Sequence, residues 1–512
     1  MLSVIFCNAQ QSKIKCYFNH PVNTNISSGA NAVYLNSSFP DTIAAYINRA
    51  KYSIDVALYN LTSTTNSKVY KVIVAANAAA ARGVQIRWIY NASSSNTGLS
   101  LLNTSIQKFA SPTINGYIMH NKFLVIDALS SNLSDPTTIT GSYNFSDTQT
   151  DTDYNNILII QDKNVTTAYY NEFNKMWGST SMIPDTINSK FGTKKSASTI
   201  KSFLVGDDLV EVFFSPKDTV GQKLQTAINS TNYDLFFGIY AFTDNTIANL
   251  IKSKYDNGIR VRGIADNFSN SYSPYATLNP ALGSNFISYA GTGIYHNKVM
   301  LIDALNPESD PQVFTGSFNW SASAQNSNDE NSILIHNASI ANQYYQSLCA
   351  DFTAMGGIPC VYAPCSNANT IFISNIRGNS YQWQVNTGAG FVNISDNAVY
   401  NGTNTVNLSF INAPSSWYGY QYRCMINNVD YSEINNLKFS AYWNGSVSTA
   451  WENPLNWNCG NIPDANTDVF VNYGVTRFPV LNSSTVCRSL RANRGTIINI
   501  TPAAILKLTG LY

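Results

Sequence analysis

The stretch His120-Asn-Lys122-Phe-Leu-Val-Ile-Asp127 occurs a second time in the chain, as His296-Asn-Lys298-Val-Met-Leu-Ile-Asp303. Each copy leads to a second shared phrase, Gly141-Ser-Tyr-Asn144-Phe-Ser in the first case and Gly316-Ser-Phe-Asn319-Trp-Ser in the second. One copy alone would be typical of a packed strand followed by a turn. Two copies with the same residue types in the same order indicate an internal duplication with a shared function.

The two motifs end two longer repeats of the same organisation. In both repeats a helix, a strand, a second helix and a second strand precede the motif, at residues 41–49, 54–62, 69–81 and 84–90 in the first and 223–229, 234–243, 247–255 and 259–265 in the second. Alternating helices and apolar strand-like runs predict an α/β fold. We therefore expect two similar lobes at residues 30–178 and 206–355, related by a pseudo-twofold axis and joined by a polar connector at 179–205.

The spacing of the polar residues predicts which side chains lie together. Residues two apart on a strand project from the same face, so each motif histidine should lie beside the lysine that follows it. The motif acids Asp127 and Asp303 have the opposite parity and are expected to be structural. The candidate phosphate-binding residues share a two-residue spacing and are Ser142, Asn144, Ser317 and Asn319. Two ammonium groups and two amides would hold a tetrahedral anion, while two imidazoles would divide nucleophilic attack and proton transfer.

The pattern His-x-Lys-x-x-x-x-Asp followed by Gly-Ser-x-Asn, complete in both copies, resembles the phospholipase D superfamily. The resemblance covers residues 30–350 approximately. It implies an α/β fold of two similar lobes, with β-sheets flanked by helices, that form one active site. It also implies catalysis by His120, Lys122, His296 and Lys298 through a phosphohistidine, with no metal and no cofactor.

The superfamily usually has an acidic residue shortly after the motif glycine, where it orients a histidine. The second repeat has Glu330 at this position, whereas the first has Asn155. We expect each residue to lie beside the histidine of its own repeat. Glu330 then raises the pKa of His296, whereas His120 stays neutral beside the amide of Asn155. On that basis we predict that His120 is the nucleophile and His296 the general acid and then base, in agreement with the superfamily's usual preference for the N-terminal histidine.

The composition points to a multidomain secreted protein. A chain of 512 residues is too long for one hydrophobic core. Charged residues make up only 12% and the net charge is +1, so the chain has no overall electrostatic signature of nucleic-acid binding, although a small nuclease is not excluded. Residues 1–10 resemble the tail of a secretory signal peptide, and no window approaches the ~20 apolar residues of a membrane span. A secreted or surface-located bacterial monomer is expected.

The cysteines lie at the two ends of the chain. None falls between Cys16 and Cys349, which excludes a thiol nucleophile and a cysteine-ligated zinc ion from the repeats. The C-terminal cysteines suit disulfides in an oxidising compartment, with their pairing open, and are Cys349, Cys360, Cys365, Cys424, Cys459 and Cys487.

The last third of the chain has β-rich texture. Residues 381–385 and 419–424 resemble strands C and F of an immunoglobulin-like sandwich at 361–440, with Tyr422 placed as in a tyrosine corner. Residues 441–512 predict a further β module, which Cys459 and Cys487 could close. This module ends abruptly and resembles C-terminal surface modules of secreted Bacteroidetes-type proteins. A cell-surface or polysaccharide ligand is one candidate partner for these modules.

Three functions are compatible with the sequence. The first is a phospholipase D that hydrolyses phospholipid phosphodiesters or transfers the phosphatidyl group to another alcohol. The second is a nuclease of the same superfamily, and the third is an inactive surface-binding protein. Secretion and the aromatic-rich composition favour the lipid substrate, with Tyr59 and Tyr240 expected near the substrate entrance.

Overall fold

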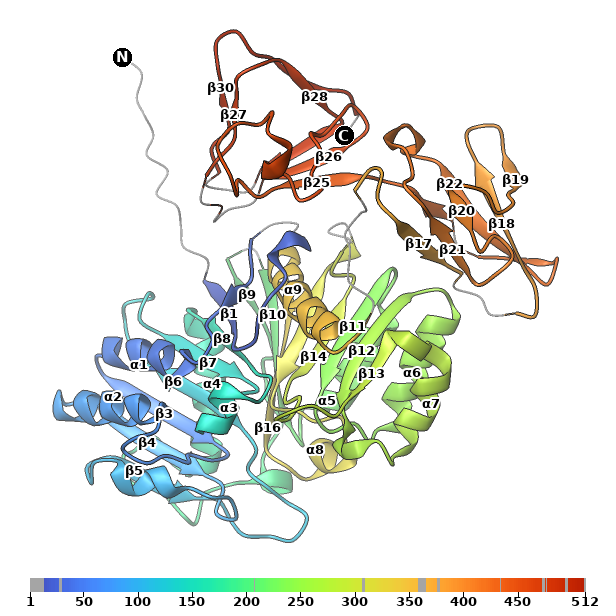
Figure 1. The fold of residues 1–512 in the computed structure, drawn as a ribbon. Helices are drawn as coiled ribbons and strands as arrows, with labels where there is room; N and C mark the ends of the chain where they lie inside the picture. The colour runs from blue at the N-terminus through green and yellow to red at the C-terminus, as the bar shows by residue number, and fades with distance from the viewer. Residues whose placement is uncertain are drawn as a thin grey trace.

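The computed structural model describes residues 13–26, 30–206, 208–305, 309–357, 365–374, 378–432, 434–471, 475, 477–492 and 496–510. The predicted signal-peptide remnant at residues 1–10 lies outside these ranges, as do Cys7 and Cys360. Two α/β lobes, each built on an eight-stranded sheet, are followed by two smaller β modules (Figure 1). The predicted fold class is therefore confirmed for the two lobes.

The first lobe has its strands in the order β2-β1-β8-β7-β6-β3-β4-β5. Its elements are β1 (Ile14–Phe18), β2 (Val33–Tyr34), α1 (Phe39–Arg49), β3 (Ser53–Leu58), α2 (Tyr70–Ala81), β4 (Gln85–Tyr90), β5 (Gln107–Ala110), β6 (Lys122–Ile126), β7 (Thr137–Gly141), α3 (Asp147–Asp151), β8 (Asn156–Ile160) and α4 (Lys163–Trp177). Strands β3, β4 and β5 are parallel, whereas β6 runs antiparallel to β3. The start of β6 therefore lies at the same edge of the sheet as the ends of these three strands.

The second lobe repeats this plan, in the strand order β13-β12-β11-β14-β15-β16-β10-β9. Its elements are β9 (Ser202–Val205), β10 (Asp208–Ser215), α5 (Val220–Asn229), β11 (Asp234–Ile239), α6 (Asn245–Asp256), β12 (Arg260–Asp266), α7 (Ser273–Leu282), β13 (Phe286–Tyr289), β14 (Lys298–Ile302), β15 (Gln312–Gly316), α8 (Ala322–Asn326), β16 (Glu330–His336) and α9 (Ala338–Ala354). Each motif strand, β6 or β14, thus lies near the middle of its sheet.

Helices α4 and α9 join the two lobes. Helix α4 contacts β6 and β7 of its own sheet and β10 of the other, while α9 contacts β11, β14 and β15 and also β1. One apolar cluster contains side chains from both lobes, such as Tyr169, Phe214 and Tyr344. Helices α1 and α2 lie outside the first sheet, and α6 and α7 lie outside the second (Figure 1). The shared core fixes the motif strands of the two lobes relative to each other.

Two predicted boundaries differ from the structure. Strand β1 pairs antiparallel with β8, so the first lobe begins well before residue 30. Strand β9 pairs with β10 and belongs to the second sheet, so the connector ends before residue 202. Both strands complete sheets by long-range pairing, for which the local sequence carries no signal.

The third unit is a sandwich of two small antiparallel sheets. Its strands are β17 (Thr370–Ile373), β18 (Tyr381–Asn386), β19 (Phe391–Asn393), β20 (Tyr400–Asn401), β21 (Asn407–Phe410), β22 (Gln421–Ile426), β23 (Asp430–Tyr431) and β24 (Asn435–Asn436). Trp383, Tyr422 and Cys424 are fully buried in its core. The Tyr422 hydroxyl bonds the hydroxyl of Tyr400 at 3.0 Å, whereas a tyrosine corner bonds the backbone. The immunoglobulin-like identity stays a prediction.

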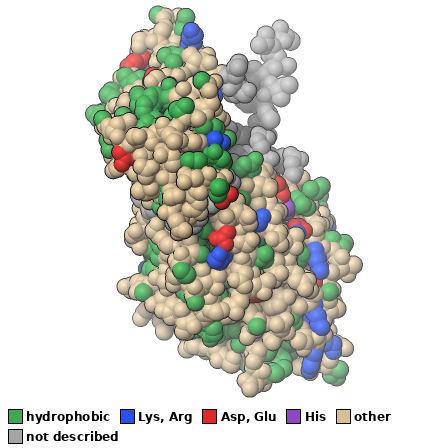
Figure 2. All heavy atoms as spheres, turned by 90° about the vertical axis from the view of Figure 1, so that its right-hand side faces the viewer, with side chains coloured by type: hydrophobic (Ala, Val, Ile, Leu, Met, Phe, Trp, Pro, Cys, Tyr) green, Lys and Arg blue, Asp and Glu red, His purple; other side chains and the backbone are tan. Residues whose placement is uncertain are grey.

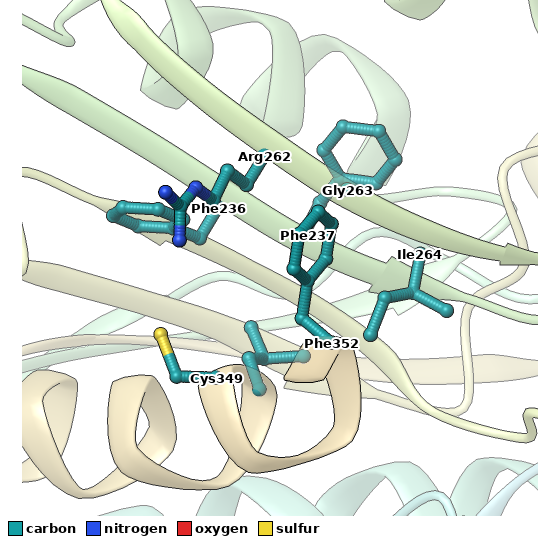
Figure 3. A pocket seen from close by; sticks show the side chains of 8 residues that line it. Phe236, Phe237, Arg262, Gly263, Ile264, Cys349 and Phe352 are labelled. Atoms are coloured by element: carbon teal, nitrogen blue, oxygen red, sulfur yellow. The ribbon is translucent and has the colours of Figure 1, made fainter. Parts of the chain in front are cut away.

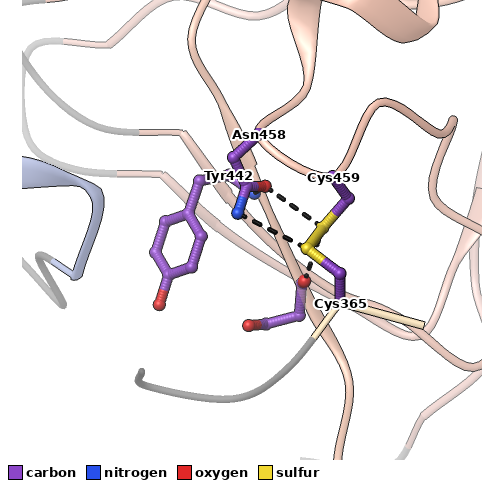
Figure 4. The surroundings of a disulfide bond; sticks show 5 residues. Cys365, Tyr442, Asn458 and Cys459 are labelled. Atoms are coloured by element: carbon purple, nitrogen blue, oxygen red, sulfur yellow. Dashed lines mark hydrogen bonds between the residues drawn. A yellow bond between two sulfur atoms is a disulfide. The ribbon is translucent and has the colours of Figure 1, made fainter. Parts of the chain in front are cut away.

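The described part of the last unit has one three-stranded and two two-stranded sheets, all with parallel strands. Its strands are β25 (Ser440–Trp443), β26 (Asp468–Val471), β27 (Val480–Leu481), β28 (Thr485–Cys487), β29 (Ser489–Ala492), β30 (Asn499–Ile500) and β31 (Leu506–Leu508). A disulfide joins Cys365, at the start of the sandwich, to Cys459 in this unit (Figure 4). The suggested Cys459–Cys487 bridge is therefore wrong, and Cys487 is a buried free thiol. Cys349 is also disulfide-bonded. The disulfide links the two β modules covalently.

Across the residues that the structure describes, no helix has both the length and the apolar character needed to cross a bilayer.

Candidate active site

The two motif histidines lie where the lobes meet. His120 lies two residues before β6 and His296 two residues before β14, and both are buried, with 6% and 4% of their surface exposed. The ammonium group of Lys122 donates to the His120 carbonyl at 3.0 Å, and that of Lys298 to the His296 carbonyl at 2.7 Å. The charge of Lys122 acts on His296, and that of Lys298 on His120. The structure thus brings both predicted pairs into one site.

The histidine-orienting residues are exchanged between the lobes. Nδ1 of His120 lies 2.8 Å from Oε2 of Glu330, and Nδ1 of His296 lies 2.9 Å from Oδ1 of Asn155. The pairing predicted within each repeat is therefore wrong.

The physical reason for this exchange is that the loops cross the lobe interface. The His120 N–H donates to the carbonyl of Asp329 at 2.9 Å, and the Tyr154 N–H donates to the carbonyl of Ile294 at 2.9 Å. Each orienting residue follows one of these cross-lobe contacts directly in the sequence. It therefore reaches the histidine of the other lobe.

The motif serines support the orienting residues. The Ser142 hydroxyl donates to Oδ1 of Asn155 at 3.0 Å, and the Ser317 hydroxyl donates to Oε2 of Glu330 at 2.6 Å. A hydroxyl has one hydrogen to donate. The predicted role of these serines in phosphate binding is thus replaced by a role in holding the histidine partners.

The motif asparagines remain suited to binding an oxyanion. Asn144 is 6% exposed, and Oδ1 of Asn319 accepts weakly from the Ala241 N–H at 3.4 Å. Within the described residues, neither Asn144 nor Asn319 donates its side-chain amide hydrogens to a protein group. These amides are the free neutral donors of the motifs.

Hydrogen bonding fixes the tautomer of both histidines. Glu330 accepts as a carboxylate, so Nδ1 of His120 carries the proton. The Asn155 amide is oriented because its Nδ2 donates to the carbonyls of Gln149 and Asp153 at 3.0 and 3.1 Å. Its oxygen therefore faces His296 and also accepts from Nδ1. Both imidazoles present an unprotonated Nε2, which is the atom that a nucleophile or a base requires.

Burial and mutual repulsion disfavour positive charge in the site. Burial lowers the pKa of His120 to about 4, with Glu330 opposing the shift and Lys122 adding to it. Burial also lowers the pKa of Lys122 to about 7. The pKa values of His296 and Lys298 fall well below their usual range, through burial first and then through neighbouring cations. An anionic phosphate would favour the protonated forms of these groups and be held by them.

The motif acids lie at the far end of the motif strands. Asp127 accepts hydrogen bonds from the backbone N–H groups of Lys51, Tyr52 and Ser53 at 2.7–2.9 Å. Asp303 does the same for residues 232–234 at 2.8–3.1 Å. Both acids therefore hold the backbone at the start of a neighbouring strand, which agrees with their predicted structural role.

An aromatic ring covers each histidine–lysine pair. Tyr59 lies 5.0 Å from the ring centre of His120, and the Lys122 ammonium lies 5.2 Å from the Tyr59 ring. Tyr240 has the equivalent position, 5.3 Å from His296 and 5.0 Å from the Lys298 ammonium. Both tyrosines are only partly buried, which agrees with their expected place near the entrance.

The connector contributes a buried lysine that the sequence did not reveal. Lys195 is 4% exposed and contacts the carboxylates of Glu172 and, at 2.7 Å, Asp329. Asp329 also accepts from the Tyr117 hydroxyl at 2.5 Å. This cluster holds the segment that carries Glu330 against the first lobe. No repeat or motif includes Lys195, so only the packing shows its role.

The other features that could form a site in the described residues lie outside the two motifs. Within the described ranges, no group of three or more His, Cys, Asp or Glu side chains is placed to hold a metal ion. His20 stacks on Tyr154, and His336 is paired with Asp310 and Glu211. A small, largely apolar pocket between β11, β12 and α9 is lined by Phe236, Phe237, Arg262, Gly263, Ile264, Leu348, Cys349 and Phe352 (Figure 3).

Sequence comparison gives matches in both lobes. A family model described as "Cardiolipin synthase, PLD-like domain" matches residues 43–177 and 224–351, just over half of the chain. A "Phospholipase D" of Rickettsia bellii is 29% identical over 140 residues, which are 27% of this chain and 66% of that protein. The "Phospholipase D" of Rickettsia felis is 29% identical over 166 residues, 31% of this chain and 79% of that protein.

Solved structures also match the chain. Phosphatidylserine synthase from Haemophilus influenzae has 13% sequence identity and a TM-score of 0.46, covering 65% of this chain and 85% of that one. The phospholipase D family member Nuc from Salmonella typhimurium has 24% identity and a TM-score of 0.26, covering 29% of this chain and 95% of that one. From the match of the family model to both lobes, we conclude that the chain belongs to the phospholipase D superfamily.

Proposed function

We propose that the chain is a phospholipase D-type phosphodiesterase that cleaves phospholipids through a covalent phosphohistidine on His120. The observation that carries the proposal is the contact between His120 Nδ1 and the Glu330 carboxylate across the lobe interface. When Nε2 of an imidazole bonds phosphorus, the ring becomes cationic. A buried carboxylate on Nδ1 stabilises that charge, whereas the amide of Asn155 on His296 does so less well.

The remaining groups have roles in this scheme. Lys122 and Lys298 neutralise the phosphate, and Asn144 and Asn319 donate to its oxygens. Nε2 of His120 attacks phosphorus while protonated His296 gives its proton to the leaving alcohol oxygen. His296 then removes a proton from water, or from a second alcohol in a transfer reaction. The attack of that oxygen breaks the phosphorus–His120 bond, which leaves His120 neutral and His296 protonated as at the start.

The assignment of His120 as nucleophile thus rests on a reason different from the sequence argument. The sequence argument required a neutral His120 beside an amide, and the exchanged partners remove it. The low pKa of His120, about 4, keeps the imidazole neutral before attack. The Glu330 carboxylate then stabilises the cationic phosphohistidine, as the acidic residue that orients a histidine does in other nucleophilic sites.

A diester with a good leaving group tests the assignment. Bis(p-nitrophenyl) phosphate releases nitrophenolate without needing a general acid. His296→Asn should therefore give a burst of about one nitrophenolate per enzyme and an acid-labile phosphoenzyme, while His120→Asn should give neither. A burst in His120→Asn and none in His296→Asn would reverse the roles.

The choice of a lipid substrate rests on the low charge of the chain. Charged residues are 12% of the chain, and Figure 2 shows one face on which Lys and Arg are few among uncharged side chains. Few cations disfavour a long nucleic-acid track. Headgroup release from phospholipid micelles, abolished in His120→Asn, would support the lipid substrate. Nicking of plasmid DNA, abolished by the same change and without headgroup release, would support the nuclease instead.

We also propose an extracytoplasmic location. The Cys365–Cys459 bridge supports it, because disulfides persist in oxidising compartments. Recovery of the protein from the periplasm or medium with blocked Cys459 thiol would agree, whereas a cytoplasmic protein with free thiol would contradict the proposal.

A further inference from the structure

The two halves of the active-site mouth differ in polarity. In the second lobe, Phe268 stacks on Tyr240 at 5.3 Å with an angle of 18° between the rings, and it is 62% exposed. At the equivalent place in the first lobe, Ser93 follows β4 and bonds Nδ2 of Asn91 at 2.9 Å. An aromatic shelf therefore flanks the His296 half, and a hydroxyl flanks the His120 half.

The two halves also differ in the residue that bonds the backbone directly before each motif histidine. Asp266 accepts from the Tyr295 N–H at 2.7 Å, directly before His296. Asn91 makes the equivalent bond, at 3.0 Å, to the Met119 N–H directly before His120. The two residues are structural counterparts, one charged and one neutral.

A second pair of counterparts differs in the same direction. Asp153 accepts from the Ile294 N–H at 2.9 Å, while Asn328 accepts from the Ile118 N–H at 3.1 Å. Asp266 and Asp153 thus bond the segment before His296. Asn91 and Asn328 bond the segment before His120. All four side chains are at least nine-tenths buried, so the acids act through their field and not as exposed ligands.

The acids are close enough to affect their surroundings. The pKa of the Tyr240 hydroxyl is raised by burial and then by Asp266 and Asp153, whereas that of Tyr59 is raised by burial. Glu330, and then Asp266 and Asp153, counteract the strong lowering of the Lys298 pKa by burial. The His296 half therefore combines negative potential with an exposed aromatic face. This combination attracts organic cations and repels the neighbouring phosphates of a polyanion.

We infer that the shelf formed by Tyr240 and Phe268, with Asp266 and Asp153 behind it, is the subsite for the leaving alcohol and selects one that carries a positive charge. The inference rests on the proposed function. In an in-line displacement the leaving oxygen lies opposite the nucleophile. With His120 attacking, that oxygen and its substituent lie beside His296 and this shelf. The phosphate with its retained substituent lies toward the half that carries Asn91 and Ser93.

A pair of isosteric substrates tests the charge preference. Phosphatidylcholine is compared with the phosphatidyl ester of 3,3-dimethylbutanol, which replaces the ammonium nitrogen by carbon, in identical detergent micelles. The wild-type protein should prefer the choline ester by roughly tenfold in kcat/KM. Replacing Asp266 and Phe268 by their counterparts, as Asp266→Asn with Phe268→Ser, should bring the ratio to within about twofold of unity.

The reciprocal change provides the matched control. Asn91→Asp with Ser93→Phe places the same groups in the other lobe and should leave the choline preference of the enzyme in place. Should the double variant of the second lobe fail to fold, Phe268→Ser alone, at a 62% exposed ring, should still lower the ratio severalfold.

Each outcome decides between the two proposals. Equal turnover of the two esters by the wild type would overturn the inference. So would a choline-ester preference that is unchanged in Asp266→Asn with Phe268→Ser. Either result would leave the proposed phosphodiesterase activity in place. A ratio that responds only to Asn91→Asp with Ser93→Phe would place the leaving group on the other side. Cleavage of single-stranded DNA without turnover of either ester would overturn the proposed function and this inference together.

Discussion

Replacement of Glu330 by glutamine tests the central contact of the site. Glu330 is fully buried and accepts from Nδ1 of His120 at 2.8 Å and from the Ser317 hydroxyl at 2.6 Å. Although burial alone would raise its pKa, His120 and Lys122 hold that pKa below its usual value, so the side chain is a carboxylate at neutral pH. Glutamine keeps the size and one acceptor oxygen but removes the charge.

The size of the effect follows from the bond that is weakened. A hydrogen bond to a charged group contributes roughly 1.5–3 kcal/mol. In Glu330→Gln this amount is lost chiefly where the His120 ring is cationic, which is the transition state and the phosphoenzyme. Since about 1.4 kcal/mol corresponds to a factor of ten in rate, kcat should fall by about 10- to 150-fold. KM should change little, because Glu330 lies behind the imidazole and not beside the phosphate.

Steady-state kinetics with bis(p-nitrophenyl) phosphate separate these parameters. Glu211→Gln is the matched control, since Glu211 is an ion-paired carboxylate of the second sheet that lies beside Lys223 and His336, away from the active site. Unfolding midpoints of both variants show whether lost activity reflects lost stability. A kcat within twofold of wild type in a folded Glu330→Gln protein, or a loss confined to KM, would refute the role given to this carboxylate.

Three further changes have defined outcomes. Asn155→Asp should raise the depressed pKa of His296, because it places a carboxylate on Nδ1 of the ring. The protonated acid form then persists to higher pH, so the alkaline limb of the kcat–pH profile should move to higher pH. A move to lower pH would contradict the assignment. Asp127→Ala removes the acceptor of three backbone N–H groups and should lower the free energy of unfolding by about 2–4 kcal/mol in urea titrations, with Asp127→Asn less affected. Cys459→Ser removes a disulfide between residues 94 positions apart and should lower the thermal midpoint of the C-terminal modules, while diester turnover persists. Loss of diester turnover at the same temperature as unfolding of the modules would show that the modules stabilise the lobes.

The sequence predicted the catalytic groups better than their partners. Strand parity and duplication sufficed to place each histidine beside its lysine, because both residues lie within one short segment. The partners of the histidines could not be predicted in the same way. His120 meets Glu330 only because the segment before β16 crosses to the first lobe. A repeat alignment compares equivalent positions, and it contains no information about contacts across the pseudo-twofold axis.

The same limit explains the other differences. Ser142 and Ser317 were assigned to the phosphate because their spacing matches that of the asparagines, but spacing fixes only the face of the strand. Their hydroxyls donate instead to Asn155 and Glu330, which lie directly before β8 and at the start of β16, the neighbouring strands. Strand β1 was missed because five residues at the chain start gain their strand character from pairing with β8.

The differences between the lobes have a consequence for catalysis that depends on both lobes being in one chain. In a dimer of identical lobes every substitution appears twice, so both histidines would have the same partner and both halves of the mouth the same charge. Here Asn155 stands at the position equivalent to Glu330, and Asn91 at the position equivalent to Asp266. The carboxylate that stabilises a cationic ring and the carboxylate that would attract a cationic alcohol therefore lie on opposite halves. Under the proposed mechanism, this arrangement would give the reaction a direction. A diester bound the other way round would place its leaving group beside Asn91 and Ser93, and its phosphorus beside His296, which has no carboxylate partner.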